Sequence, residues 1–365
     1  MNVEKRKMIG AGLLVGLLGV VLVLLGNPKN MGVCVACFLR DIGGALGLHR
    51  AAVVQNIRLE IPGFILGSFL AALAFKEFRP RGGSSPILRF FMGAMVSIAT
   101  LVFLGCPLRM ILRLAAGDLN ALVGLLGFTS GIAVGIYFLK KGFSLGRSYP
   151  QTKVAGTTGP LFAIFLVVLA VLAPAFILRS ESGPGSMSAP LIYSLGAGLL
   201  IGAVAQRTRL CMVGGIRDMI MFKDSHLLSG FAAIFVVALI GNLITGNFNL
   251  GFAEQPIAHS NHFYNYLGML ATGLGAALLG GCPLRQLILA GEGDSDAMVT
   301  VMGLIVGAAT AHNFGLAASG SGVPVNGQIA NWVVLALLVV IGLGAREAIS
   351  VKRSQVKSTG KEVKA

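Results

Sequence analysis

Long apolar stretches recur along the whole chain, and short polar segments separate them. A helix of about 20 apolar residues is long enough to cross a bilayer. Ten stretches come close to this length, at residues 8–26, 61–75, 88–105, 119–139, 160–178, 190–206, 227–245, 266–281, 297–312 and 331–345. The pattern therefore predicts an all-α polytopic membrane protein with ten helical spans.

Two of these spans end at a Cys-Pro pair that begins a further, shorter apolar stretch. The pairs are Cys106-Pro107 and Cys282-Pro283. Proline is favoured at the first position of a helix, because its missing N–H loses no hydrogen bond there. Each pair is therefore predicted to form the cap and first turn of a re-entrant half-helix that is too short to cross the membrane.

Cysteines and arginines of the first half recur in the second half at a nearly constant distance. The offset is 177 residues for the first two pairs and 176 for the last two, which are Cys34 and Cys211, Arg40 and Arg217, Cys106 and Cys282, and Arg109 and Arg285. Five predicted spans lie in each half. Because five is an odd number, the second copy is expected to enter the membrane from the opposite face.

Inverted repeats of this kind form many secondary transporters, whose substrate site lies near the midplane where interrupted helices of both halves meet. We expect repeat 1 at residues 1–159, completed by the fifth span at 160–178. Repeat 2 is expected at residues 186–345 and a basic cytoplasmic tail at residues 346–365. A parallel repeat, which needs an even number of spans, is the alternative.

The formal charge of +15 fits membrane topology rather than nucleic-acid binding. With the N-terminus inside and ten alternating spans, 22 of the 29 Lys and Arg residues fall on the cytoplasmic side, as the positive-inside rule expects. Both termini are therefore predicted to be cytoplasmic. The first apolar run is long and no small-x-small cleavage site follows it, so we expect a retained span rather than a signal peptide.

Arg109 and Arg285 lie in the first turns of the two predicted half-helices, three residues after Cys106 and Cys282. A helix N-terminus offers free N–H groups and a partial positive charge, and both attract anions. Neither arginine has an acidic residue in its own first turn, so an anionic ligand is the expected counter-charge. The half-helices are therefore candidate binding elements for a small anion.

Cys34 and Cys211 each precede a short, glycine-rich segment that carries an Arg-Asp pair. These segments are too polar for a full crossing, so we expect re-entrant pieces that are buried in protein. Arg40 and Arg217 either form structural ion pairs with the adjacent aspartates or bind substrate. Ionisable residues at membrane depth are costly, and this cost makes them functional candidates.

Cys37 has Gly214 as its counterpart in the second half, so it is as consistent with packing as with function. The Cys34-x-x-Cys37 spacing also permits a redox dithiol, and a membrane thiol-disulfide oxidoreductase is the alternative function. A passive anion channel would share the arginines but gives no reason for the cysteines. The sequence contains no Walker motif and no zinc spacing, so we expect no enzyme activity, no metal and no cofactor.

Several longer motifs resemble the sulfur-transport (YeeE/YedE) family of bacterial inner-membrane proteins, and within it the YedE branch of selenium transporters. The motifs are GNPKNMGVCVAC at residues 26–37, HRAA at 49–52, KEFRPRGGSSP at 76–86 and GFSLGR at 142–147. The resemblance covers nearly the whole chain. It implies an integral permease of the bacterial inner membrane with a pseudo-symmetric body of two repeats.

The resemblance also implies a substrate class and a set of site residues. The better-understood branch takes up thiosulfate, and the YedE branch is associated with selenium, so a small inorganic anion of either element is the expected substrate. The family cysteines map onto Cys34, Cys106, Cys211 and Cys282, while Cys37 belongs to the YedE branch. Membrane lipid and a cytoplasmic sulfur or selenium carrier protein are the other candidate partners.

Overall fold

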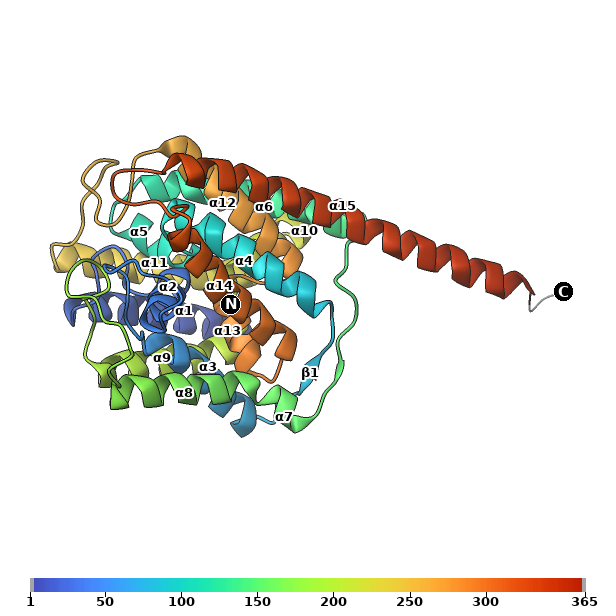
Figure 1. The fold of residues 1–365 in the computed structure, drawn as a ribbon, viewed down its shortest axis with the longest axis horizontal. Helices are drawn as coiled ribbons and strands as arrows, with labels where there is room; N and C mark the ends of the chain where they lie inside the picture. Colours follow the sequence, from blue (N-terminus) through green and yellow to red (C-terminus); the bar gives the residue numbers. More distant parts are fainter. Residues whose placement is uncertain (1–2, 363–365) are drawn as a thin grey trace.

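Helices make up nearly all of the regular structure, as the apolar pattern predicts. The computed structural model describes the backbone of residues 3–362 and the side chains of residues 3–344, so the side chains of the predicted basic tail at 346–365 lie outside the described residues. Two short strands, β1 (Arg81–Gly82) and β2 (Tyr149–Pro150), pair antiparallel. The other elements are helices that pack into one bundle (Figure 1).

Each of the ten predicted spans corresponds to a helix. These helices are α1 (Val3–Leu24), α3 (Glu60–Ala74), α4 (Pro86–Phe103), α6 (Asn120–Lys140), α8 (Thr158–Leu172), α9 (Leu191–Thr208), α11 (His226–Ile244), α12 (His262–Leu279), α14 (Ser295–Asn313) and α15 (Val325–Glu362). Within the described part of the chain, eight helices are long and apolar enough to cross a membrane. The prediction of a multi-pass membrane protein is therefore confirmed.

The two spans that fall short of this length are α3 and α8. Each has 15 residues, which at 1.5 Å per residue gives a length of about 22 Å. The hydrocarbon core of a bilayer is about 30 Å thick. Both helices are apolar, but neither is long enough for an untilted crossing by itself.

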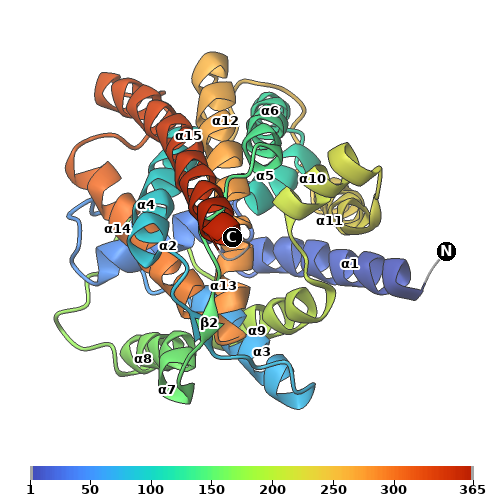
Figure 2. The ribbon, with the colours of Figure 1, turned by 90° about the vertical axis from the view of Figure 1, so that its right-hand side faces the viewer.

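Five shorter helices complete the fold. They are α2 (Val35–Ala45), α5 (Pro107–Ala115), α7 (Lys153–Gly156), α10 (Met212–Phe222) and α13 (Pro283–Gly291). The half-helices predicted after the two Cys-Pro pairs are α5 and α13, with 9 residues each. The start and short length of both helices are thus confirmed, while their re-entry into the membrane stays a prediction. In both views of the bundle, α13 lies between a group that contains α4 and α12 and a group that contains α3 and α9 (Figures 1 and 2).

The long helices pack in pairs that join the two halves of the chain. Thus α1 lies against α11, α3 against α9, α4 against α14 and α6 against α12. Glycines make these contacts close: Gly131 of α6 faces the carbonyl of Leu270, and Gly202 of α9 faces that of Phe64, with no room for a Cβ atom at either glycine. Close backbone approach of this kind stabilises helix pairs in a membrane, where lipid removes most of the hydrophobic driving force.

Helices α3 and α9 run in the same direction, so their corresponding ends lie together at opposite ends of the bundle. At one end Arg207, in the last turn of α9, forms an ion pair at 2.9 Å with Glu77, which follows α3. At the other end Arg58, which precedes α3, donates to the carbonyl of Met187 before α9 at 2.6 Å. The cytoplasmic assignment of the first end rests on the distribution of basic residues and stays a prediction.

Candidate functional site

Each of the four matched cysteines is the residue immediately before a short helix. Cys34 precedes α2, Cys106 precedes α5, Cys211 precedes α10 and Cys282 precedes α13, and all four have extended backbone angles. All four are buried. The N-termini of four short helices are therefore each occupied by a thiol inside the bundle, where free N–H groups and the helix dipole favour anions.

Two of these thiols close the first turn of their helices directly. The sulfur of Cys34 accepts from the backbone N–H of Cys37 at 3.3 Å, and the sulfur of Cys211 accepts from that of Gly214 at 3.5 Å. A side-chain oxygen of Ser, Thr, Asp or Asn usually fills this capping role. The cap needs only a backbone N–H from the residue three positions later. Cys37 and Gly214, which occupy this position in the two halves, both provide it.

The structure groups the matched cysteines into two pairs, each formed within one half of the chain. The thiols of Cys34 and Cys106 lie close together, as do those of Cys211 and Cys282. All five cysteines, including Cys37, are free thiols. Cys37 joins the first pair because its thiol interacts with that of Cys34.

Arg109 lies against the first cysteine pair and is fully buried. Its Nε donates to the carbonyl of Asn30 at 2.9 Å, and its Nη2 donates to that of Ile257 at 2.9 Å. Its Nη1 donates to the carbonyl of Leu104 and to the sulfur of Cys37, the latter at 3.3 Å. Among the described residues no carboxylate pairs with this guanidinium, and four of its five N–H donors have acceptors in the protein.

Arg285 differs, because it has a carboxylate partner. Its Nη1 and Nη2 donate to the two oxygens of Glu292 at 2.9 and 3.4 Å. Glu292 follows α13 directly, two turns after Arg285, so the expectation drawn from the first turn alone missed it. Its counterpart 176 residues earlier is Ala116. A comparison of the two half-helices beyond their first turns would have shown this difference.

Arg40 forms the predicted ion pair with the adjacent Asp41, and this pair is part of a larger cluster. Its guanidinium donates to Oδ1 of Asp41 at 2.7 and 2.9 Å, and Arg58 donates to Oδ2 of the same aspartate at 2.8 Å. All three side chains are buried. In the second half Arg217 pairs with Asp218 at 2.9 Å, but its side chain is 37% exposed. Sequence reasoning had not included Arg58, which no local motif marks.

Arg113 lies one turn beyond Arg109 on α5 and is also fully buried. Its Nε donates to Asp118 at 2.7 Å, and the guanidinium lies 4.3 Å from the ring centre of Phe103. Asp118 also accepts from the backbone N–H of Asn120 at 3.0 Å, which fixes the turn into α6. The charge of Arg113 is therefore neutralised within the first half, whereas Arg109 has no carboxylate partner among the described residues.

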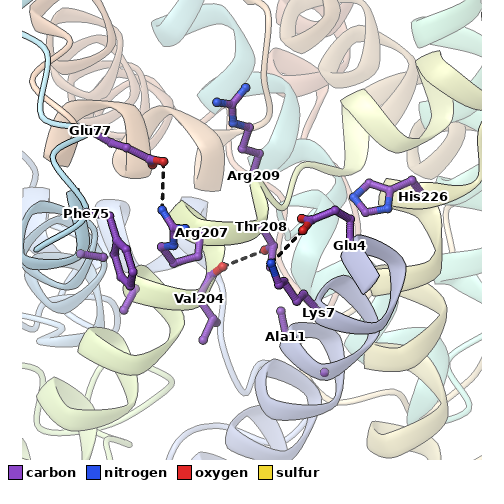
Figure 3. A pocket seen from close by; sticks show the side chains of 13 residues that line it. Glu4, Lys7, Ala11, Phe75, Glu77, Val204, Arg207, Thr208, Arg209 and His226 are labelled. Carbon is purple, nitrogen blue, oxygen red and sulfur yellow. Dashed lines mark hydrogen bonds and ion pairs between the residues drawn. The ribbon is translucent and has the colours of Figure 1, made fainter. Parts of the chain in front are cut away.

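A groove of about 850 Å³ opens at the end of the bundle where α1, α3 and α9 meet (Figure 3). Basic side chains from α1 and α9 line it together with Glu77, whose pKa is lowered by a hydrogen bond from Gln206 and by the Arg207 guanidinium. The nine predicted site residues do not line it. One of its lining residues, Arg209, lies two residues before Cys211 in the chain.

Comparison with known proteins relates the second half of this chain to sulfur transport. The family described as Sulphur transport matches residues 207–363, which contain the second cysteine pair. The thiosulfate transporter TsuA of Spirochaeta thermophila is 34% identical over 100 residues, which cover 27% of this chain and 30% of that protein. The thiosulfate transporter TsuA of Escherichia coli is 29% identical over 107 residues, which cover 29% of this chain and 30% of that protein. The matched segments thus span less than a third of either relative.

Proposed function

From the Sulphur transport match over residues 207–363, we propose that this multi-pass chain is a permease for a small sulfur- or selenium-containing anion. The observation that carries the proposal is the placement of four buried thiols at the N-termini of four short helices. Thiols alone would favour redox chemistry and arginines alone an anion channel. Their combination at helix N-termini fits an anion with one charged end and one soft chalcogen end.

Thiosulfate is the first candidate, because two relatives are named as its transporters. Its oxygens carry most of the negative charge and suit N–H groups and the Arg109 guanidinium. Its terminal sulfur is a soft acceptor for thiol S–H groups. The resemblance of residues 26–37 to the YedE branch makes a selenium species the second candidate.

The cysteine pairs supply two stations for such an anion. We place the entry station at Cys34 and Cys106 and the exit station at Cys211 and Cys282. Thiol contacts hold the terminal sulfur at each station without a covalent bond, so no oxidant or reductant is consumed. Passage inward across a bacterial inner membrane then needs the anion to move between stations, with local adjustment of the short helices.

The inverted-repeat arrangement belongs to the same proposal, with repeats at residues 1–178 and 186–345 and both termini in the cytoplasm. Corresponding backbone contacts at opposite ends of the bundle support it. The N–H of Arg79 donates to the carbonyl of Glu292 at 2.9 Å, and that of Asn249 donates to the carbonyl of Ala116, also at 2.9 Å. Each contact joins the loop after a long helix to the end of a half-helix in the other repeat.

The long helices support the same symmetry. The pairing of α1 with α11 corresponds to that of α9 with α3, and the pairing of α4 with α14 corresponds to that of α12 with α6. The last helix of each repeat departs from this rule. α8 packs against α3, whereas α15 packs against α12 and α4.

A membrane thiol-disulfide oxidoreductase is the second candidate function, because the Cys34 and Cys37 thiols interact within one helical turn. The two functions are separated by uptake of radiolabelled thiosulfate and selenite in cells that lack their own transporters. Cells with the intact chain should accumulate one of the ions, and Cys106→Ala or Cys282→Ala at matched protein level should abolish accumulation. Accumulation that survives both substitutions would refute the cysteine pathway.

A further inference from the structure

The corresponding arginines of the two half-helices have different partners. Arg109 donates to three backbone carbonyls and to the Cys37 sulfur, and no carboxylate in the described part of the chain pairs with it. Arg285 contacts both carboxylate oxygens of Glu292, at 2.9 and 3.4 Å. The position of Glu292 is occupied by Ala116 in the first half, since 292 − 176 = 116. The second cysteine pair thus has a counter-charge that the first lacks.

The partners also turn the two side chains in opposite directions along their helices. Arg285 lies in the first turn of α13 and Glu292 follows the last residue, so the ion pair draws the guanidinium toward the C-terminal end and away from Cys282 at the cap. Arg109 turns back to the beginning of α5, where its Nη1 contacts the carbonyl of Leu104 just before the cap. The guanidinium of Arg109 therefore lies beside the positive end of its half-helix, whereas that of Arg285 is drawn toward the other end.

The neighbouring Arg-Asp clusters increase this difference. In the first half a single carboxylate, Asp41, is shared by Arg40 and Arg58. In the second half Arg217 has Asp218 as its own partner and is partly exposed. Around its arginines the first site is therefore more positive and better shielded from water than the second, and burial strengthens the attraction between unlike charges.

We propose that Glu292 makes the second cysteine pair a weak site from which the anion is released, while the first pair captures it. This inference rests on the proposed function. Glu292 also lies 3.8 Å from Arg81, which has Asp294 as its own partner at 2.7 Å. An anion at the second pair therefore meets arginines whose charges are already offset by carboxylates of its own sign.

Glu292 follows the last residue of α13 and Cys282 precedes its first, which at 1.5 Å per residue puts them about 15 Å apart along the helix. At an effective dielectric constant of about 20, one carboxylate at this distance costs about 1 kcal/mol for each negative charge of the anion, so a dianion binds about tenfold or more weakly. The difference in affinity between the two stations favours movement of the anion from the first cysteine pair to the second.

The test measures binding and uptake of radiolabelled thiosulfate with Glu292→Gln. In purified Cys106→Ala protein, which keeps only the second pair intact, adding Glu292→Gln should tighten thiosulfate binding by about tenfold. In the otherwise intact chain the same substitution should lower the maximal uptake rate severalfold without raising KM, because release slows. Glu181→Gln, which removes an exposed carboxylate elsewhere, is the matched control and should change neither quantity.

Unchanged or weaker thiosulfate binding by Glu292→Gln would overturn the inference, as would a maximal uptake rate at or above that of the intact chain. Glu292→Asp reaches Arg285 less well and should give smaller changes in the same directions. It therefore replaces the Gln variant if that variant is not recovered as folded protein. Absence of thiosulfate uptake by the intact chain would instead refute the proposed function itself, so the two failures are distinguishable.

Discussion

The guanidinium of Arg109 donates a hydrogen bond to the sulfur of Cys37 across 3.3 Å, and this contact exists in one half of the chain only. The counterpart of Cys37 is Gly214, which contributes a backbone N–H but no side chain. Cys37 therefore contacts both Arg109 and Cys34, although it has no cysteine counterpart in the second half. A supporting role for its thiol follows from this geometry.

Replacing Cys37 separates transport from thiol redox chemistry. In the transport proposal Cys37→Ala removes one weak hydrogen bond to Arg109 while the three carbonyl contacts remain. We expect thiosulfate uptake to fall by no more than about fivefold, since a single such bond contributes about 1 kcal/mol or less. Cys34→Ala should abolish uptake at the same protein level. Equal and complete loss in both variants would favour the oxidoreductase.

Replacing Arg109 tests whether its charge or its shape matters. Lysine keeps the charge but has three donors on one nitrogen, so Arg109→Lys cannot reach all the acceptors that lie around the guanidinium. At least one buried carbonyl would lose its donor, at a cost of about 1–3 kcal/mol. We expect a lower unfolding temperature in detergent and at least about a tenfold loss of uptake.

Arg285→Lys is the matched control for this substitution. A lysine at this position can still pair with Glu292, whose carboxylate is 11% exposed. Its effect on unfolding temperature should therefore be smaller than that of Arg109→Lys. Equal destabilisation by the two substitutions would contradict the difference in environment described for the two arginines.

The sequence was sufficient for the helices, including the two short helices after the Cys-Pro pairs, but not for the partners of the charged residues. Apolar runs predicted ten helices because membrane burial acts on each segment separately, and Cys-Pro marked both half-helices for the local reason that proline suits a first turn. The role of Glu292 depends on a side chain that reaches back two turns. The role of Arg58 depends on its contact with Asp41, which is 17 residues earlier in the chain. No periodic pattern in the sequence indicates this contact.

The buried Arg40–Asp41–Arg58 cluster predicts an unequal response of the two Arg-Asp motifs to the same substitution. Asp41→Asn leaves two buried guanidinium groups without a carboxylate, and breaking a buried ion pair in this way costs about 3–5 kcal/mol. Asp218→Asn affects a partly exposed pair, for which about 1 kcal/mol or less is expected. We expect Asp41→Asn to prevent recovery of folded protein or to lower its unfolding temperature strongly. Similar unfolding temperatures for the two variants would show that the cluster is not a structural ion pair.

We expect the stability of the folded protein to depend on pH through two buried histidines in loops, His49 and His259. His49 donates from Nε2 to the carbonyl of Arg40 at 3.0 Å and accepts at Nδ1 from the N–H of Ala51 at 3.3 Å. His259 is held in the same way by the carbonyl of Val102 and a following backbone N–H. Burial lowers the pKa of both imidazoles below the ordinary value of 6.5, and protonation of Nδ1 would also remove its acceptor.

The sign of the pH effect follows from that shift. Because the folded protein binds these protons less readily than the unfolded chain, their stabilisation is fully present above the ordinary pKa of 6.5 and is lost as the pH falls below it. The unfolding temperature in detergent should therefore decrease between about pH 7 and about pH 5. His49→Gln keeps a donor for the Arg40 carbonyl but cannot titrate, so it should be less stable than the intact chain at neutral pH and should lose less stability on acidification. A decrease as steep as that of the intact chain would show that His49 is not the titrating group.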